Sequence, residues 1–218
     1  MLVCPTNCGE AMNNIWKQLQ EDIRRYRIVR RDLFCRGWDE SLCVRFNRRL
    51  AAHRSLHIIE HATGMALITR RHESMISTRA TATHASIHTF CKSGPFERRL
   101  LTADDFRAFF PTLSRPGLPR GYYVDLSQTQ PVLGFVRVEA TPAPLRRIQA
   151  RFSDWIRRHQ QHPVFNGLIC NHQFEISLLV PTASKADAIN STPLNRQCPD
   201  VTCEAVAMPL LMDLLIPR

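Results

Sequence analysis

The chain has 218 residues with a net charge of +10, and 44% of its residues are hydrophobic while 22% are charged. This is the composition of a folded globular protein, so wholesale disorder is excluded. No stretch approaches the eighteen or so apolar residues that span a membrane, and the first residues lack the basic and apolar regions of a secretory signal. We therefore expect a cytoplasmic protein that does not engage a membrane.

Eight cysteines are scattered along the chain, and four of them form two close pairs. Cys4 and Cys8 have C-x3-C spacing, and Cys198 and Cys203 have C-x4-C spacing. Neither pair has the partner spacing of a zinc site, so we expect reduced thiols and leave metal binding by either pair open. The chain also lacks the glycine-rich loops that bind nucleotides and the G-x-S-x-G motif of serine hydrolases.

The positive charge is concentrated near the N-terminus and is carried by arginine. Of the 29 basic residues only three are lysines, Lys17, Lys92 and Lys185. Between Arg24 and Arg54 ten arginines stand against three acidic residues, a local surplus of seven. A basic cluster confined to one short region is typical of a protein that binds a polyanion.

Helical periodicity follows a leader that we place at residues 1–11. The first predicted helix opens at Met12, and its apolar face is formed by Ile15, Leu19, Ile23 and Tyr26. A second, short helix is predicted over 29–36, with Val29, Leu33 and Phe34 turned inward, and Gly37 ends it. A third helix, capped by Asp39 or Ser41, has the apolar stripe Leu42, Phe46 and Leu50.

Two short β-rich runs, LHIIEH and MALITR, come directly after the third helix. Ala62, Thr63 and Gly64 separate them and predict a hairpin turn. Helix, turn, helix and hairpin in this order resemble the winged helix-turn-helix domains of many bacterial proteins, on the stretch SLCVRFNRRLAAHRSLHII. The resemblance covers residues 12–75, which we take as one domain.

With its apolar stripe buried, the third helix would expose polar side chains suited to base recognition. Arginine pairs with guanine and asparagine with adenine in the major groove, and the predicted base-reading residues are Arg45, Asn47, Arg48 and Arg49. Other arginines are placed for phosphate contacts, namely Arg30, Arg31, Arg70 and Arg71. The expected partner is double-stranded DNA, and a homodimer is compatible with the chain. The alternative is an adaptor whose winged helix contacts protein.

The second half of the chain predicts a mixed α/β domain. Residues 76–117 are assigned to a linker of undecided structure and a helix capped by Thr102 or Asp104. From residue 118 to 218 the order is two strands, a long amphipathic helix over 144–160, strands at FNGLIC and FEISLLVP, a short helix, a strand and a closing helix. The fold class is therefore α+β, a winged helix-turn-helix followed by a mixed sheet packed against helices.

A strand that ends in Asp125, a hairpin, a strand that leads to Glu139 and then a long helix resemble the PD-(D/E)XK nuclease-like core. With an upstream winged helix, the arrangement is similar to plasmid replication-relaxation proteins and related mobile-element proteins. The resemblance implies that Asp125 and Glu139 are the catalytic residues and the ligands of Mg²⁺. Alternation along the two strands predicts that these two carboxylates meet on adjacent strands.

The sequence departs from that motif at two points. The first element reads P-R-G-Y-Y-V-D, and Glu139 is followed by Ala140 and Thr141, with no lysine where the motif has one. We therefore expect a nuclease-like domain without catalysis and without a cofactor, in a DNA-binding protein that regulates, replicates or maintains a plasmid or other mobile element. The alternative is a Mg²⁺-dependent DNA endonuclease that uses Asp125 and Glu139.

Overall fold

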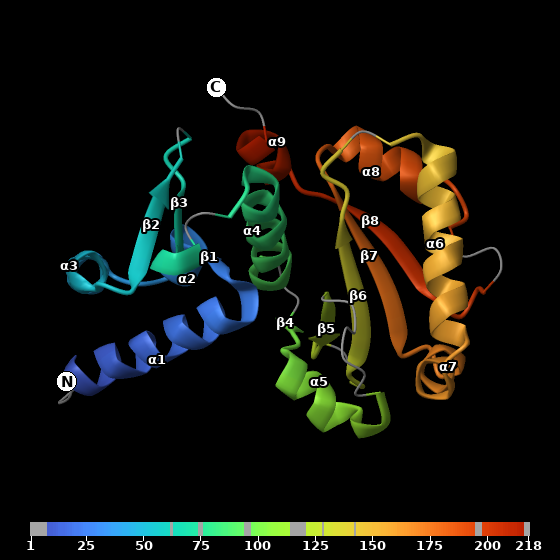
Figure 1. Cartoon of the computed structure of the whole chain (residues 1–218), viewed down its shortest axis with the longest axis horizontal. Helices are drawn as coiled ribbons and strands as arrows, with labels where there is room; N and C mark the ends of the chain where they lie inside the picture. The colour runs from blue at the N-terminus through green and yellow to red at the C-terminus, as the bar shows by residue number, and fades with distance from the viewer. Residues whose placement is uncertain are drawn as a thin grey trace, which may run out of the picture. The chain divides into compact units, whose positions relative to one another are not determined.

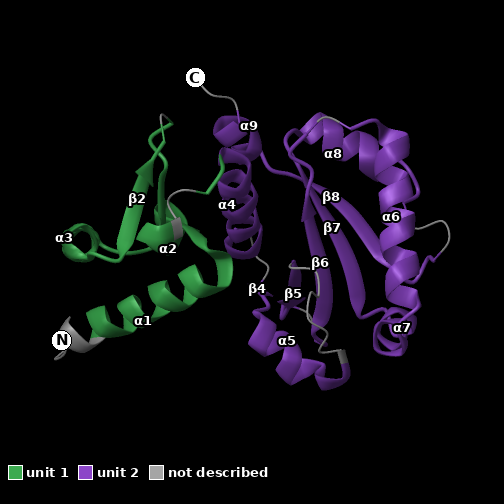
Figure 2. Ribbon diagram, in the orientation of Figure 1, with its two compact units in different colours: residues 1–77, 218 green, residues 78–217 purple. Residues whose placement is uncertain are grey.

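The computed structural model describes residues 8–61, 63–73, 76–93, 97–113, 121–127, 129–141, 143–194 and 198–215. The fold is α+β and divides into two compact units, Met1–Ser77 and Thr78–Pro217 (Figures 1 and 2). Cys4 and the predicted domain start at residue 118 lie outside the described residues. Within the described part of the chain, no helix is long and apolar enough to cross a membrane.

Unit 1 contains three helices and a small sheet. Its helices are α1 (Cys8–Tyr26), α2 (Arg31–Phe34) and α3 (Glu40–Ala52), and its strands are β1 (Ile28–Arg30), β2 (Leu56–Glu60) and β3 (Ala66–Arg70). The strands pair antiparallel in the order β1-β3-β2, and a 3-10 turn (Arg71–Glu73) follows β3. The predicted hairpin is confirmed, and Gly64 closes it with φ of 79°.

The helices of unit 1 bury the predicted apolar faces. Leu19, Ile23 and Tyr26 of α1 and Phe46 and Leu50 of α3 are all buried. The α1 helix begins at Cys8, four residues before the predicted start, and it also buries Met12 and Trp16. The predicted second helix is shorter than expected, since Val29 is buried in strand β1, where it pairs with Ile68.

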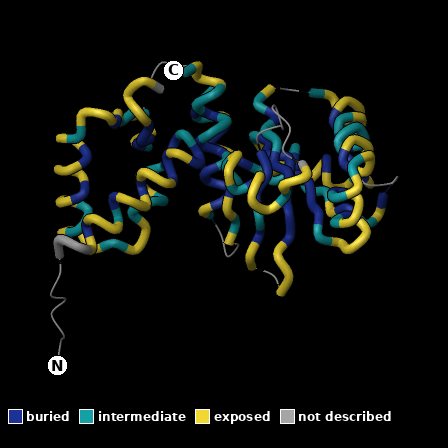
Figure 3. The backbone as a smooth tube through the Cα atoms, turned by 60° about the horizontal axis from the view of Figure 1, so that its bottom comes forward, coloured by how far each residue is buried: buried dark blue, intermediate teal, exposed yellow. Residues whose placement is uncertain are grey.

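Unit 2 is built on a five-stranded sheet of order β4-β5-β6-β7-β8. Its strands are β4 (Arg98–Leu100), β5 (Tyr122–Asp125), β6 (Val132–Val138), β7 (Phe174–Val180) and β8 (Thr202–Ala207). The pairs β4-β5 and β5-β6 are antiparallel, whereas β6-β7 and β7-β8 are parallel. All seven residues of β7 are buried, as the apolar run FEISLLV predicts for a strand inside a sheet (Figure 3).

Helices cover both faces of this sheet. The helices of unit 2 are α4 (Thr78–Lys92), α5 (Ala103–Phe109), α6 (Leu145–Gln160), α7 (Pro163–Cys170), α8 (Ala183–Asn190) and α9 (Leu210–Leu215). The α4 and α9 helices lie together on one face, and α6 and α8 lie on the other (Figure 1). Ile148, Phe152 and Ile156 anchor α6 in the core, whereas Leu145, the first residue of the helix, is exposed.

Two segments differ from the predicted elements. FNGLIC, predicted as a strand, lies in helix α7, which Pro163 opens at a position where proline fits a helix. Residues 78–92, left undecided between linker and helix, form α4, whose buried side chains are mostly small or polar. With β4 and α5, this helix belongs to unit 2, so the segment 76–117 is mainly a part of the second fold and not a linker.

The cap of α5 is Thr102, which forms a capping box with Asp105.

Gly134, in the middle of β6, leaves room for the side chain of Tyr123 to pass over this strand from β5 to β7. It pairs with Tyr123 on one side and with Glu175 on the other. The Tyr123 ring lies over the glycine, so that its hydroxyl reaches Glu175 at 2.5 Å and Ser177 at 2.9 Å on β7. A Cβ at position 134 would lie 2.0 Å from Cζ of Tyr123, which leaves no room for any side chain.

We expect Gly134→Ala to lower the free energy of unfolding by about 3 kcal/mol, because the hydrogen bonds of Tyr123 to Glu175 and Ser177 and its contact with Phe90 keep the ring from moving away. Urea denaturation followed by circular dichroism measures the change. Gly167→Ala is the matched control, since an added Cβ there meets nothing within 4 Å and lies in helix α7. That control should leave stability unchanged or raise it by about 0.5–1 kcal/mol. Equal stability of the two variants would contradict the crossing of Tyr123 over β6.

Candidate nucleic-acid interface and carboxylate cluster

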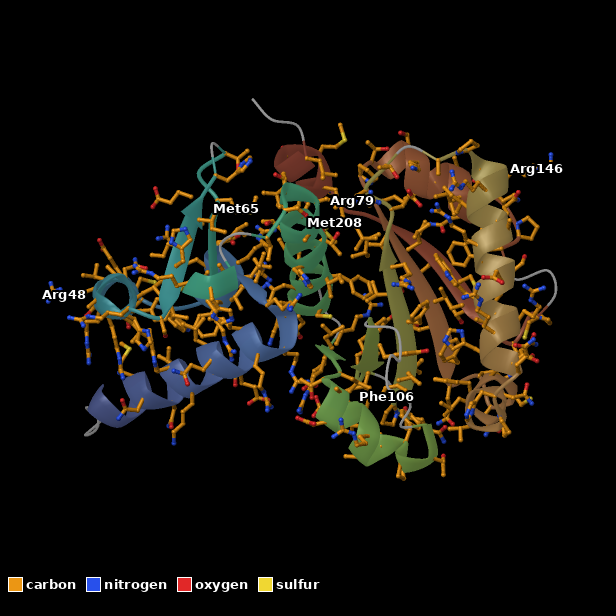
Figure 4. The ribbon with its side chains drawn as sticks, in the orientation of Figure 1. Arg48, Met65, Arg79, Phe106, Arg146 and Met208 are labelled. Atoms are coloured by element: carbon orange, nitrogen blue, oxygen red, sulfur yellow. The ribbon has the colours of Figure 1, made fainter. Side chains whose placement is uncertain are left out.

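The side of α3 that faces away from the core of unit 1 is basic. Asp39 caps this helix, with the backbone N–H of Leu42 donating to its Oδ1 at 2.7 Å. Since Phe46 and Leu50 are buried, the side chains between and opposite them are exposed, and these include Arg45, Asn47 and Arg48. Arg48 points away from the ribbon (Figure 4). Three of the four predicted base-reading residues are thus exposed, and Arg45 and Arg48 lie one turn apart on the same side of the helix.

Arg49, the fourth predicted base-reading residue, turns toward α1. Its guanidinium carbon lies 5.0 Å from the centre of the Trp16 ring, and its Nη1 donates to Oδ1 of Asn13 at 3.2 Å. A cation over an indole face is attracted by the ring quadrupole, so this arginine fastens α3 to α1. We therefore assign Arg49 to the packing of unit 1 and not to base reading.

Val44 is a member of the exposed α3 surface that the sequence analysis missed. It lies one helical turn before Arg48 and is 50% exposed, which is unusual for a large aliphatic side chain. The signal was available in the sequence, because a residue four positions before an outward arginine shares its side of a helix. An aliphatic group there can contact the methyl group of thymine.

The four arginines predicted to contact phosphates are not equivalent. Arg30 ends β1 and pairs with Asp32, with 2.5 Å between Nη2 and Oδ2, while the half-buried Arg31 opens α2. Arg70 and Arg71 are exposed at the base of the hairpin, where the backbone N–H of Arg71 donates to the carbonyl of Ser55. They lie at the end of β3 away from the hairpin turn.

In unit 2 the structure separates the two carboxylates that were predicted to share a metal ion. Asp125 pairs with Val132 at the start of β6, and Glu139 follows the last residue of that strand. Seven residues of extended chain between Val132 and Glu139 correspond to about 23 Å. The prediction that Asp125 and Glu139 meet is therefore wrong, because the turn after Asp125 sets a register that puts them at opposite ends of β6.

Glu139 and Asp125 also have different partners. Glu139 is buried, pairs with Arg151 of α6 and accepts a hydrogen bond from the hydroxyl of Thr141 at 2.9 Å. Asp125 pairs with Arg98 of β4 at 3.1 Å and accepts the backbone N–H of Ser127 at 2.9 Å. Each carboxylate is thus neutralised by its own arginine.

Asp125 belongs to a polar cluster that continues across the sheet face covered by α4. Arg98 bridges Asp125 and Glu204 of β8, at 3.1 and 3.6 Å, and its guanidinium stacks 4.2 Å from the centre of the Phe90 ring of α4. The Ser177 hydroxyl donates to Glu204 at 3.1 Å and also bonds the Tyr123 hydroxyl. Arg98 was not singled out from the sequence, and neither were the acids of β7 and β8.

Opposing effects act on the acids of this cluster. Burial raises the pKa of Asp125, but the hydrogen bonds from Ser127 and the charge of Arg98 lower it further than burial raises it, so the pKa falls below its usual 3.8. Burial raises the pKa of Glu175 above its usual 4.5, and the hydrogen bond from Tyr123 only partly offsets this. Asp125 is therefore held as the carboxylate, while Glu175 retains its proton to higher pH than a free glutamate.

Neither a search for metal-binding groups nor a comparison with known proteins assigns a function to further residues. Among the described residues, no group of three or more His, Cys, Asp and Glu side chains is arranged to hold a metal ion. Cys198 and Cys203 lie in or against the core of unit 2, and burial raises the pKa of Cys203 to about 12. Comparison of the chain with known protein families, curated proteins and solved structures gives no match.

We expect Asp125→Asn to lower the free energy of unfolding by about 3 kcal/mol at neutral pH, because the buried Arg98 loses its closer carboxylate and keeps the longer contact with Glu204. The pKa of Asp125 is lower in the folded protein than the usual 3.8, so its carboxylate stabilises the fold at pH values above 3.8. This contribution is lost as the pH falls through the pKa that Asp125 has in the folded protein. The gap between variant and wild type should therefore narrow when denaturation is repeated at about pH 2.

The matched control is Asp187→Asn, which changes an exposed aspartate of α8. It should alter the free energy of unfolding by less than about 0.5 kcal/mol at either pH. A gap for Asp125→Asn that is the same at both pH values would argue against an ion pair as its cause.

Proposed function

We propose that the protein binds double-stranded DNA through unit 1, with α3 in the major groove. The observation that carries this proposal is the exposure of three polar side chains of α3, Arg45, Asn47 and Arg48, while Phe46 and Leu50 of the same helix are buried. Each of these polar side chains has the donors or acceptors needed to read a base edge. Bidentate pairs of this kind discriminate by about 1–3 kcal/mol against a wrong base.

The order of elements in unit 1 supports a winged helix-turn-helix. Helix, strand, short helix, longer helix and a two-stranded hairpin follow one another, and β3 lies between β1 and β2. In helix-turn-helix proteins the second helix of the motif enters the major groove. Here that helix is α3, which the turn with Gly37 in the left-handed region (φ 81°) separates from α2.

For the second unit we propose a nuclease-like core that has lost catalysis. The strand-hairpin-strand-helix order from β5 to α6 supports the resemblance, and the separation of Asp125 from Glu139 argues against a shared Mg²⁺ ion. A role in the regulation, replication or maintenance of a plasmid or other mobile element rests on that resemblance. Cytoplasmic location and a homodimer remain predictions.

We expect Arg45→Ala together with Arg48→Ala to weaken binding to duplex DNA by about 100-fold, because two charge-assisted contacts of roughly 1–3 kcal/mol each are lost. Fluorescence anisotropy with a labelled duplex measures the affinity. The control is Arg99→Ala with Arg107→Ala, which removes equal charge from exposed residues of β4 and α5.

That control should change the affinity less than about threefold, since exposed ion pairs contribute little to stability and these residues lie on β4 and α5, not on α3. Two outcomes would contradict the proposal. One is wild-type affinity in the α3 variant; the other is no affinity of the wild-type protein for duplex DNA even at low salt, which would favour the adaptor.

A further inference from the structure

Helix α6 carries two pairs of adjacent arginines that the proposed function does not use. Arg146 and Arg147 lie in its first turn, and Arg157 and Arg158 lie in its last turn. All four side chains are exposed, and Arg146 extends away from the helix in Figure 4. Equivalent members of the two pairs are eleven residues apart, which is close to three turns, so both pairs point to the same side of α6.

The acidic groups near these arginines leave a net positive surface. Asp154 lies between the pairs and bonds Arg157 at 2.7 Å and Arg158 at 2.8 Å. Each of these contacts uses one terminal nitrogen, and a guanidinium has five N–H donors, so donors remain for a further anion. Glu139 neutralises Arg151, a fifth arginine of the helix, from its buried side. Four arginines therefore stand against the one carboxylate of Asp154 on the exposed side.

We propose that the exposed face of α6, formed by Arg146, Arg147, Arg157 and Arg158, is a second DNA-binding surface that contacts the phosphates of a duplex. This inference rests on the proposed function in one respect, that the ligand is DNA. It assigns to unit 2 a role in affinity and leaves sequence reading to α3. Eleven residues of helix separate the two pairs by about 16 Å.

The chemistry of the surface favours a nucleic acid over a membrane. A helix that lies on a lipid surface inserts its apolar face, but in α6 that face, with Ile148, Phe152 and Ile156, is buried in the core of unit 2. Leu145 in the first turn is exposed, and a single leucine is too small an apolar surface to anchor a helix in lipid. The exposed side offers only polar and small side chains between the arginines. Guanidinium groups bind phosphate oxygens in a bidentate manner, which suits a backbone with a regular phosphate spacing.

The test uses the full chain and a long random-sequence duplex, with the affinity measured across a series of salt concentrations. The variant is Arg146→Ala, Arg147→Ala, Arg157→Ala and Arg158→Ala together. Each lost phosphate contact lowers the slope of log K against log salt by about 0.9, so we expect the slope to fall by about 3 to 4. Alanine is a strong helix former, so α6 should persist, which circular dichroism checks.

Two controls separate phosphate contacts from a general loss of charge. Arg79→Ala, Lys92→Ala, Arg99→Ala and Arg107→Ala together remove the same charge from exposed positions of unit 2 outside α6 and should leave the slope within about one of the wild type. Replacing the four α6 arginines by lysine keeps the charge and should restore most of the slope, because lysine also binds phosphate.

The outcomes distinguish this inference from the proposed function. An unchanged slope in the α6 alanine variant, with binding still dependent on Arg45 and Arg48, would overturn the α6 surface and leave the role of α3 intact. A reduced slope in the α6 variant, with no effect of the α3 changes, would support the α6 surface and overturn the role of α3. An equal fall of the slope in the α6 variant and in the charge-matched control would also overturn the inference.

Discussion

Burial of Phe46 and Leu50 in the core of unit 1 determines which side of α3 is exposed, and the proposed function depends on that one constraint. A helix with two fixed inward positions has no freedom to rotate, so the directions of Arg45, Asn47 and Arg48 follow from it. The stacking of Arg49 on Trp16 adds a second attachment between α3 and α1. Packing energy therefore holds the exposed arginines in place, and DNA would meet a surface that is already formed.

The same constraint acts in unit 2, where the burial of the apolar face of helix α6 determines which of its side chains are exposed. Ile148, Phe152 and Ile156 hold α6 against the sheet, so the paired arginines at its two ends remain outside. On the other side of the sheet, Gly134 provides the space in which Tyr123 reaches β7. Of the acids there, Asp125 and Glu175 are buried and bonded to Arg98 and Tyr123, whereas Glu204, which also contacts Arg98, is partly exposed.

Periodicity in the sequence predicted the elements whose burial is one-sided. The α1, α3 and α6 helices have such faces, and the exposure of Arg45, Asn47 and Arg48 followed from them. The α4 helix had no detectable period because it is covered on several sides and buries Ala82, Ser86 and Thr89. FNGLIC was too short and too apolar for periodicity to separate a strand from a helix, although Pro163 was a usable signal.

The errors at the candidate sites have a different origin, since they concern contacts between distant segments. Alternation assigns a face to Asp125 and Glu139, but the register, which the turn after Asp125 sets, decides how far apart they lie. Arg49 has a long side chain that can reach a neighbouring helix, and only the packing of α1 shows that it does so. The bridge from Arg98 to Asp125 and Glu204 joins β4, β5 and β8, which no local pattern connects.

DNA binding through α3 is tested by arginine footprinting, in which phenylglyoxal modifies exposed guanidinium groups and mass spectrometry locates them, with and without duplex DNA. We expect DNA to protect Arg45 and Arg48, while Arg99 and Arg107 react equally in both samples. Unchanged reactivity of Arg45 and Arg48 in a sample shown to be saturated with DNA would contradict the account, because the surface of α3 would then remain open in the complex.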